Sequence, residues 1–253
     1  MRATMNNFLD KKWAKILFMI VFFIPVFLGL SPYSVFAADN DPIALIVSWK
    51  SGSGVPMWYQ GKSLPTYQSP IAFSVVAVGK GSSAGQIISL KNTQIKWSVN
   101  SKYIGGGQGV QTVIYNNKTI FPGGDLNVSV SVESQDSQTG SKFFVTKYFT
   151  VPIVEPKVII QGAPFNYLFS SGADIVLNAI PFFFNVSSTD DLTFNWSING
   201  QKKTEADNTS SISIHVGDTT PASARIDLSV TNPSGSFFEK ASRSLMLKNN
   251  NSD

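Results

Sequence analysis

The chain has 253 residues, a formal net charge of +4 at pH 7, 43% hydrophobic residues, no cysteine and one histidine. The lack of cysteine excludes a disulfide-stapled scaffold, a thiol nucleophile and a thiolate metal site. A single histidine also excludes a zinc site built on histidines.

The N-terminus has the layout of a secretory signal peptide. Lys11, Lys12 and Lys15 precede an apolar run at 16–30, and small residues before Ala37 form a cleavage site after it. An uncleaved transmembrane anchor is the alternative, because about twenty uncharged residues follow Lys15, enough to span a bilayer. Both alternatives place the rest of the chain outside the membrane, either extracellular or in the cell envelope.

The positive charge belongs mostly to this leader. It holds four basic residues and one acidic residue, which leaves 16 basic and 15 acidic residues in the remainder. The basic residues of the remainder are scattered, whereas nucleic-acid binding needs a concentrated basic patch. We therefore expect no nucleic-acid partner, and membrane contact only through the N-terminal segment if it is uncleaved.

Beyond the leader, apolar and polar residues alternate with a period of two, which is typical of half-buried strands. Gly- and Asn-rich turn signals, such as 105–107 and 199–200, separate these segments. Many short strands at this spacing predict an all-β antiparallel fold, a sandwich or a barrel. The clearest alternating segments are 95–99, 126–132, 194–198, 212–214 and 226–230.

The chain also contains an internal repeat, offset by about 100 residues, which is the length of one sandwich domain. Each half carries the pattern apolar, polar, Trp, Ser, aliphatic, Asn, then an alternating strand, then a double Phe that we assign to a further strand. The corresponding segments are 95–100 and 194–199, 126–130 and 226–230, and 143–144 and 237–238.

The repeat predicts the domain boundaries. After the leader at 1–37 we expect a first sandwich at 41–152 and a second at 158–248. A Pro-containing linker at 153–157 joins them, because proline favours an extended, semi-rigid connection. Residues 249–253 are expected to be a disordered tail.

The repeated tryptophan motif resembles the third-strand motif of immunoglobulin-like and polycystic-kidney-disease-type (PKD-like) repeats of bacterial surface proteins. Trp196-Ser197-Ile198-Asn199-Gly200 carries it fully, and the motif at Trp97 has Ser in place of the Gly. The resemblance implies two tandem immunoglobulin-like sandwiches with Trp97 and Trp196 at their centres. It also implies surface display, adhesion or spacing, and sometimes polysaccharide contact. The cysteine pair of antibody domains is missing, so the indoles must pack on aliphatic residues, and the acidic turn common in the PKD-like type is missing too.

No catalytic, cofactor or metal site is predicted. His215 alternates with Ile212 and Ile214 and is expected on the wet face of a strand. Gly105-Gly106-Gly107 lacks the Lys-Ser/Thr of a phosphate loop and is expected to be an inter-strand turn. The acidic residues show no calcium-loop spacing, although calcium held by loop carboxylates stays open. A hydrolase would need two carboxylates facing each other across a groove.

Two aromatic segments are candidate contact sites. Trp58, Tyr59 and Tyr67 lie in a long polar stretch, where they either meet a partner or fold back over the sandwich. Phe182, Phe183 and Phe184 break the strand alternation, so at least one faces away from its own core. The preceding Pro181 favours an edge position, and this edge meets either an external partner or the first sandwich.

The sequence thus predicts a non-enzymatic, exported binding, adhesion or spacer module whose partner is an unidentified extracellular protein or glycan. The alternative is a carbohydrate-binding accessory protein that uses Trp58, Tyr59 and Tyr67 as a stacking platform.

Overall fold

Alternating residues form strands throughout the described part of the chain. The computed structural model describes residues 41–253 apart from 136–141, 205–207, 218–220 and 251–253. The predicted leader and the last three residues of the predicted tail lie outside that part. Within it, the helical segments are short 3-10 turns, among them Gly81–Ser83, Phe165–Tyr167 and Thr189–Asp191, and none is long and apolar enough to cross a membrane.

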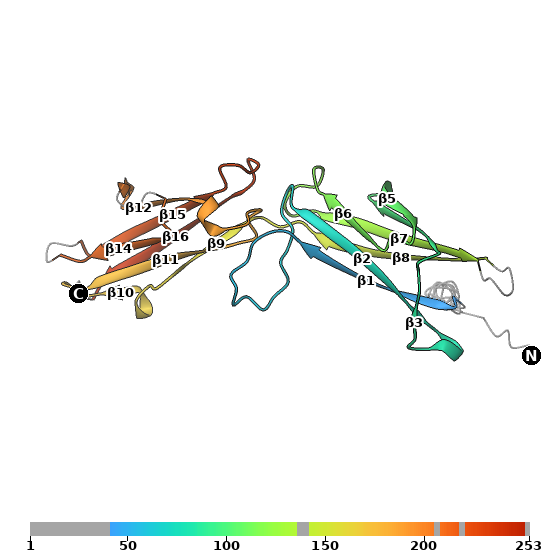
Figure 1. Cartoon of the computed structure of the whole chain (residues 1–253). Helices are drawn as coiled ribbons and strands as arrows, with labels where there is room; N and C mark the ends of the chain where they lie inside the picture. The colour runs from blue at the N-terminus through green and yellow to red at the C-terminus, as the bar shows by residue number, and fades with distance from the viewer. Residues whose placement is uncertain (1–40, 136–141, 205–207, 218–220, 251–253) are drawn as a thin grey trace, which may run out of the picture. The chain divides into compact units, whose positions relative to one another are not determined.

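The first sandwich has two antiparallel sheets (Figure 1, blue to yellow). In one sheet β2 lies between β1 on one side and β3 and β6 on the other, and the second sheet has the order β5-β4-β7-β8. The strands are β1 (Ile43–Ser51), β2 (Pro70–Gly79), β3 (Ile87–Ile88), β4 (Gln94–Val99), β5 (Lys102–Gln108), β6 (Thr112–Asn116), β7 (Asp125–Gln135) and β8 (Lys142–Pro152).

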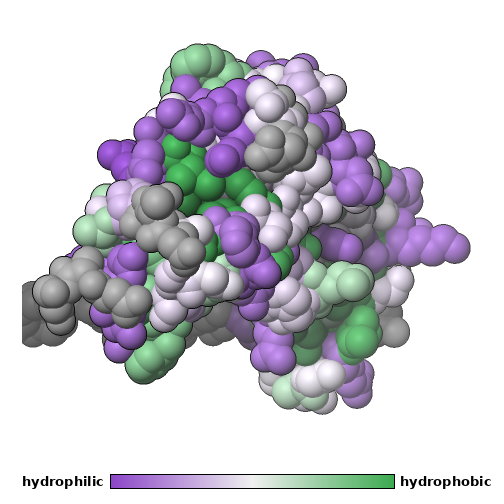
Figure 2. Space-filling model, turned by 90° about the vertical axis from the view of Figure 1, so that its left-hand side faces the viewer, coloured by the Kyte–Doolittle hydropathy of each residue, from purple (hydrophilic) through white to green (hydrophobic). Residues whose placement is uncertain are grey.

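The second sandwich repeats this plan with the sheets β14-β11-β9 and β10-β16-β15-β12-β13. Only the short β10–β16 pair is parallel among the described strands. Hydrophilic residues cover most of the side of the second sandwich seen in Figure 2, with hydrophobic residues in smaller patches. The strands are β9 (Lys157–Gln161), β10 (Leu168–Phe169), β11 (Asp174–Phe182), β12 (Thr193–Ile198), β13 (Gln201–Lys202), β14 (Ser211–His215), β15 (Ser223–Thr231) and β16 (Lys240–Asn249).

One tryptophan lies at the centre of each sandwich. Trp97 and Trp196 are both fully buried, and each belongs to a separate hydrophobic cluster. Their indole N–H groups donate to the backbone carbonyls of Val110 (3.3 Å) and Thr209 (3.0 Å), each 13 residues further along the chain. The repeat therefore includes the hydrogen bond that satisfies the buried indole. Trp97 also stacks on Phe73, so its packing is partly aromatic.

The Asn residues of the repeated motif form equivalent tight turns. Asn100 and Asn199 have φ of 48° and 50°, and the following Ser101 and Gly200 have φ of 64° and 79°. Such left-handed pairs favour Asn-Gly and match the twist of a hairpin. Asn199 also accepts, through Oδ1, the backbone N–H of Arg225 at 2.8 Å, and Asn100 makes the same bond with Asn127.

Two local predictions are wrong. Gly105-Gly106-Gly107 is not a turn but part of β5, paired with Ile95 to Trp97. A Cβ on Gly106 would lie 2.2 Å from the carbonyl oxygen of Ile95, so glycine is needed where β5 approaches the β4 backbone. The double Phe at 237–238 lies in a turn before β16 and not in a strand.

The segment between the sandwiches is tied to the first of them. Ile153 is buried in the first hydrophobic cluster, and Val158 is the first residue of the second. The Val154 N–H donates to the carbonyl of Pro65 at 2.9 Å. Residues 41–253 form one compact unit that contains both cores.

Candidate functional site: an aromatic joint between the sandwiches

The long loop between β1 and β2, residues 52–69, is held in shape by buried hydroxyl groups. The Ser53 hydroxyl is hydrogen-bonded to those of Ser51 (2.8 Å) and Ser63 (2.9 Å), which closes the base of the loop. At its other end the hydroxyls of Thr66 and Ser69 are 2.8 Å apart, and both side chains are buried. The polar sequence of this loop therefore reflects an internal network and not a disordered connection.

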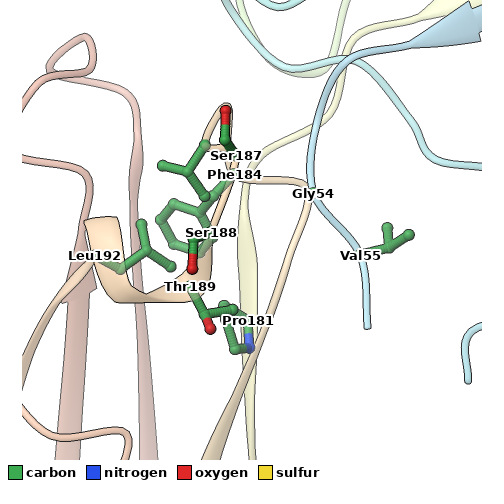
Figure 3. Close-up of a pocket in the computed structure, with 9 residues that line it drawn as sticks. Gly54, Val55, Pro181, Phe184, Ser187, Ser188, Thr189 and Leu192 are labelled. Carbon is green, nitrogen blue, oxygen red and sulfur yellow. The ribbon is translucent and has the colours of Figure 1, made fainter. Parts of the chain in front are cut away.

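The loop forms a backbone bridge to the second sandwich. Gly54 donates its N–H to the carbonyl of Phe184 at 2.6 Å, and Phe183 donates its N–H to the carbonyl of Gly54 at 2.7 Å. A small pocket of about 90 Å³ lies beside this bridge, lined by Val55 and Leu192 among others. Figure 3 shows Gly54 beside the segment that carries Phe184, with Pro181 and Leu192 on the same side of the pocket as Phe184.

The three consecutive phenylalanines point in different directions. Phe184 belongs to the core of the second sandwich, whereas Phe183 is buried but lies in neither hydrophobic cluster. Phe183 has φ of 64°, a left-handed conformation that is costly for a bulky residue. This turn of the backbone interrupts the strand alternation. Pro181 is paired only with β9, because β14 pairs with β11 over Asp174 to Asn178.

The tip of loop 52–69 meets these phenylalanines through ring edges. Tyr59 contacts Phe182 and Phe183, with ring centroids 5.5 and 6.0 Å apart, and Trp58 contacts Phe182 at 5.9 Å. All three pairs are close to perpendicular, a favoured geometry for aromatic rings. Trp58 remains 61% exposed and Met57 is fully exposed, so the tip is only partly covered.

A second aromatic cluster, which we call the Tyr67 cluster, links the sandwiches at another point. The Tyr67 ring stacks on Phe121 of the loop before β7, at 5.5 Å and 15°. Phe238, in the turn before β16, approaches Tyr67 at 5.3 Å and Phe121 at 5.2 Å. Residues far apart in the sequence therefore form one three-ring contact.

Glu239 organises the side of the joint that belongs to the second sandwich. Its buried carboxylate accepts the backbone N–H of Asn185 at 2.6 Å and the side-chain amide of Asn232 at 2.8 Å. Asn185 follows Phe184, and Glu239 follows Phe238. The carboxylate thus ties together the two segments that contact the first sandwich.

The joint includes all six aromatic residues suggested by the sequence, in two groups, although Phe184 takes part through its backbone carbonyl while its ring packs in the second core. Sequence reasoning missed Phe121, Phe238 and Glu239. The sequence predicts a strand for the paired phenylalanines at 237–238, which lie in a turn, and a lone Glu beside them carries no pattern. Contact of these aromatic segments with an external partner stays a prediction.

Outside the joint, the described titratable groups include one exposed ion pair and one lysine beside an aromatic ring. The His215 ring is 2.8 Å from the Asp174 carboxylate, and both side chains are about 70% exposed, as in an ordinary cross-strand pair. Burial lowers the pKa of Lys62, whose ammonium lies 3.3 Å from the centre of the Trp49 ring. In the described part of the chain no three His, Cys, Asp or Glu residues gather as metal ligands.

No protein-family model and no curated protein matches this sequence. Among solved structures, the three N-terminal domains of the bacteriophage RB49 highly immunogenic outer capsid protein are 14% identical, with 82% of this chain and 59% of that chain covered and a TM-score of 0.43. The ICAM-5 D1–D4 ectodomain fragment is 9% identical (83% and 61% covered, TM-score 0.26). Sidekick-1 immunoglobulin domains 1–4 are 13% identical (83% and 70% covered, TM-score 0.27).

The chain thus spans about three fifths of the length of the first two of these structures. At such TM-scores these similarities carry no argument about what the chain binds. The immunoglobulin-like assignment agrees with the chain's own topology, in which two sheets of mainly antiparallel strands enclose one tryptophan in each sandwich.

Proposed function

We propose that the chain is an exported, non-enzymatic binding and spacer module of the cell surface or envelope, made of two immunoglobulin-like sandwiches. The observation that carries this proposal is the joint. Loop 52–69 makes a backbone bridge to Phe184, and the Tyr67 cluster makes a second, aromatic contact. Two separate contacts, together with a short Pro-containing linker, restrain how the sandwiches move against each other, which is what a spacer requires.

The joint also bears on where a partner would bind. Tyr67, Phe183 and Phe184 use their apolar surface inside the molecule. Of the candidate contact residues, Trp58 keeps the most exposed surface, beside the exposed Met57. In a carbohydrate platform made of Trp58, Tyr59 and Tyr67, the face of Tyr67 that stacks on Phe121 would not be available to the sugar.

Surface exposure tests the proposal directly. We would express the full chain with a C-terminal epitope tag, treat intact cells with antibody and with protease, and determine the mass of the N-terminus. We expect an accessible tag, with a mature N-terminus at Ala38, or with Met1 retained in the membrane fraction. A variant lacking residues 16–30 is the control and should stay inside the cell. A chain that carries the unaltered leader, keeps Met1 and is found in the cytosolic fraction would overturn the proposal, whereas a processed chain with a protected tag would place it in the envelope and not at the surface.

A further inference from the structure

The outer face of the β5-β4-β7-β8 sheet, away from the core of the first sandwich, is hollowed. The hollow has a volume of about 410 Å³, within the range of small-ligand sites. It takes no part in the joint. The side chains that line it include Lys96, Ser98, Tyr103, Ser131, Glu133 and Phe144.

Aromatic side chains stand on both edge strands of this face. Tyr103 lies on β5, and Phe144 and Tyr148 lie on β8; their exposed fractions are 55%, 63% and 75%. The register places Tyr103, Ser98, Ser129 and Tyr148 in one row across the four strands. At strand spacings of about 4.8 Å the two tyrosine backbones are about 14 Å apart. Tyr103 and Phe144 line the hollow from the two edge strands, and Tyr148 stands on the same face, two alternate positions along β8 from Phe144. We call this face a trough with aromatic walls.

The floor of the trough is polar and low. The central strands β4 and β7 present Ser98, Ser129 and Ser131 to this face, and the Ser131 hydroxyl is hydrogen-bonded to that of Thr146 at 2.9 Å. One cation and one anion line the trough, on Lys96 and Glu133, so their charges cancel. The site thus offers hydroxyl groups, one ammonium donor and one carboxylate acceptor, which lie between flat apolar rings.

The second sandwich has the same hollow without the aromatic walls. It also measures about 410 Å³ and is lined by Ser197, Ser229 and Ser242, so the fold itself produces the trough. The edge strands of the second hollow carry no aromatic residues at these positions, which shows that the fold does not require them. In the matching register the positions of Tyr103, Tyr148 and Phe144 are occupied by Lys202, Ser244 and Lys240, of which Lys202 and Ser244 line the second hollow.

This arrangement is the reverse of a protein–protein interface. Such interfaces have an apolar centre and a polar rim, whereas here the centre is polar and the rim is aromatic. Nucleic acid is disfavoured, because Glu133 offsets the single lysine of the trough. A sugar chain fits both parts, since its ring faces are apolar enough to stack on aromatic rings and its hydroxyl groups hydrogen-bond to a polar floor.

We propose that the trough of the first sandwich binds a neutral, unbranched chain of pyranose sugars, stacked on Tyr103, Phe144 and Tyr148. This inference rests on the proposed role as a surface-binding module and names the class of its ligand. The sugars lie over the serine floor between the two edge strands. The trough of the second sandwich does not bind them, because it lacks the rings.

Isothermal titration calorimetry with cellohexaose, xylohexaose, mannohexaose and chitohexaose tests this on the whole protein. We expect at least one hexasaccharide to bind with a stoichiometry of one. Tyr103→Ala and Tyr148→Ala should each weaken binding by about tenfold, since each removes one stacking ring. Tyr103→Phe keeps the ring and should bind within about threefold of wild type if stacking dominates. Phe165→Ala removes an exposed aromatic ring of the second sandwich and is the matched control.

Each remaining outcome contradicts the inference. If no hexasaccharide binds, or if Tyr103→Ala and Tyr148→Ala bind as wild type does, the trough is not a sugar site. Loss of binding only in Trp58→Ala would place the site on loop 52–69. Circular dichroism checks that each variant is folded, and exposed positions should tolerate these changes. Surface exposure of the tag is measured separately, so absent sugar binding does not decide the proposed function.

Discussion

The contact between Tyr67 and Phe238 should contribute measurably to coupling between the sandwiches. The two rings are 5.3 Å apart at 66°, and an aromatic pair of this kind contributes about 0.5–1.5 kcal/mol. Tyr67→Ala alone should cost more, because it also removes the stack on Phe121. A double-mutant cycle of Tyr67→Ala and Phe238→Ala separates the pair from these other losses.

The assay is urea denaturation of the four proteins of the cycle, followed by fluorescence of the buried tryptophans. We expect a coupling free energy of about 1 kcal/mol between the two substitutions. A matched control cycle pairs Tyr67→Ala with Phe165→Ala. Phe165 is an aromatic residue of the second sandwich that is 88% exposed, and the two changes should be additive. A coupling below about 0.3 kcal/mol for Tyr67 and Phe238 would refute the reasoning, because distant independent sites already scatter by that amount.

Three further predictions concern single residues. Ser101→Gly should raise the free energy of unfolding by about 0.5–1 kcal/mol in thermal melts, because Ser101 has φ of 64°, whereas Gly200→Ser should lower it. Glu239→Ala should cost about 1–3 kcal/mol in urea denaturation, since it removes the acceptor of the Asn185 N–H, and an unchanged midpoint would contradict the joint network. Hydrogen bonds from Ser244 and then from Arg225 lower the pKa of Asp227. The ionised carboxylate therefore stabilises the fold above its unfolded pKa of about 4, and this stabilisation is lost as pH falls through the lower pKa of the folded state. Calorimetry of Ser244→Ala should show a smaller loss on acidification than wild type.

The sequence predicts the parts of the fold that depend on local pattern. Alternation predicts β4, β7, β12 and β15, and the repeated tryptophan motif predicts the centre of each sandwich. Both patterns can be recognised within a single short segment of the sequence. The glycine run at 105–107 misleads for a physical reason. Glycine serves turns and also strands that approach closely, and only the neighbouring strand distinguishes the two.

The candidate site depends on tertiary contacts and is predicted less completely. The aromatic segments at 58–67 and 182–184 stand out in the sequence because their aromatic rings break a polar or alternating pattern. Their packing against each other depends on Gly54 meeting Phe184, 130 residues along the chain, which no local pattern reveals. The sequence does not reveal the trough, because Tyr103, Phe144 and Tyr148 lie on two strands that become opposite edges only after the sheet forms.

The comparison of the two sandwiches separates what the fold needs from what it does not. Both keep the buried indole, its bond to a carbonyl 13 residues away, and the Asn that closes the next turn and accepts from a neighbouring strand. Loop 52–69 and the aromatic walls of the trough occur in one copy only. Since the second sandwich builds its sheets and its hollow without them, folding alone does not account for these residues. We attribute loop 52–69 to restraint of the joint, and we attribute the aromatic walls of the trough to ligand contact.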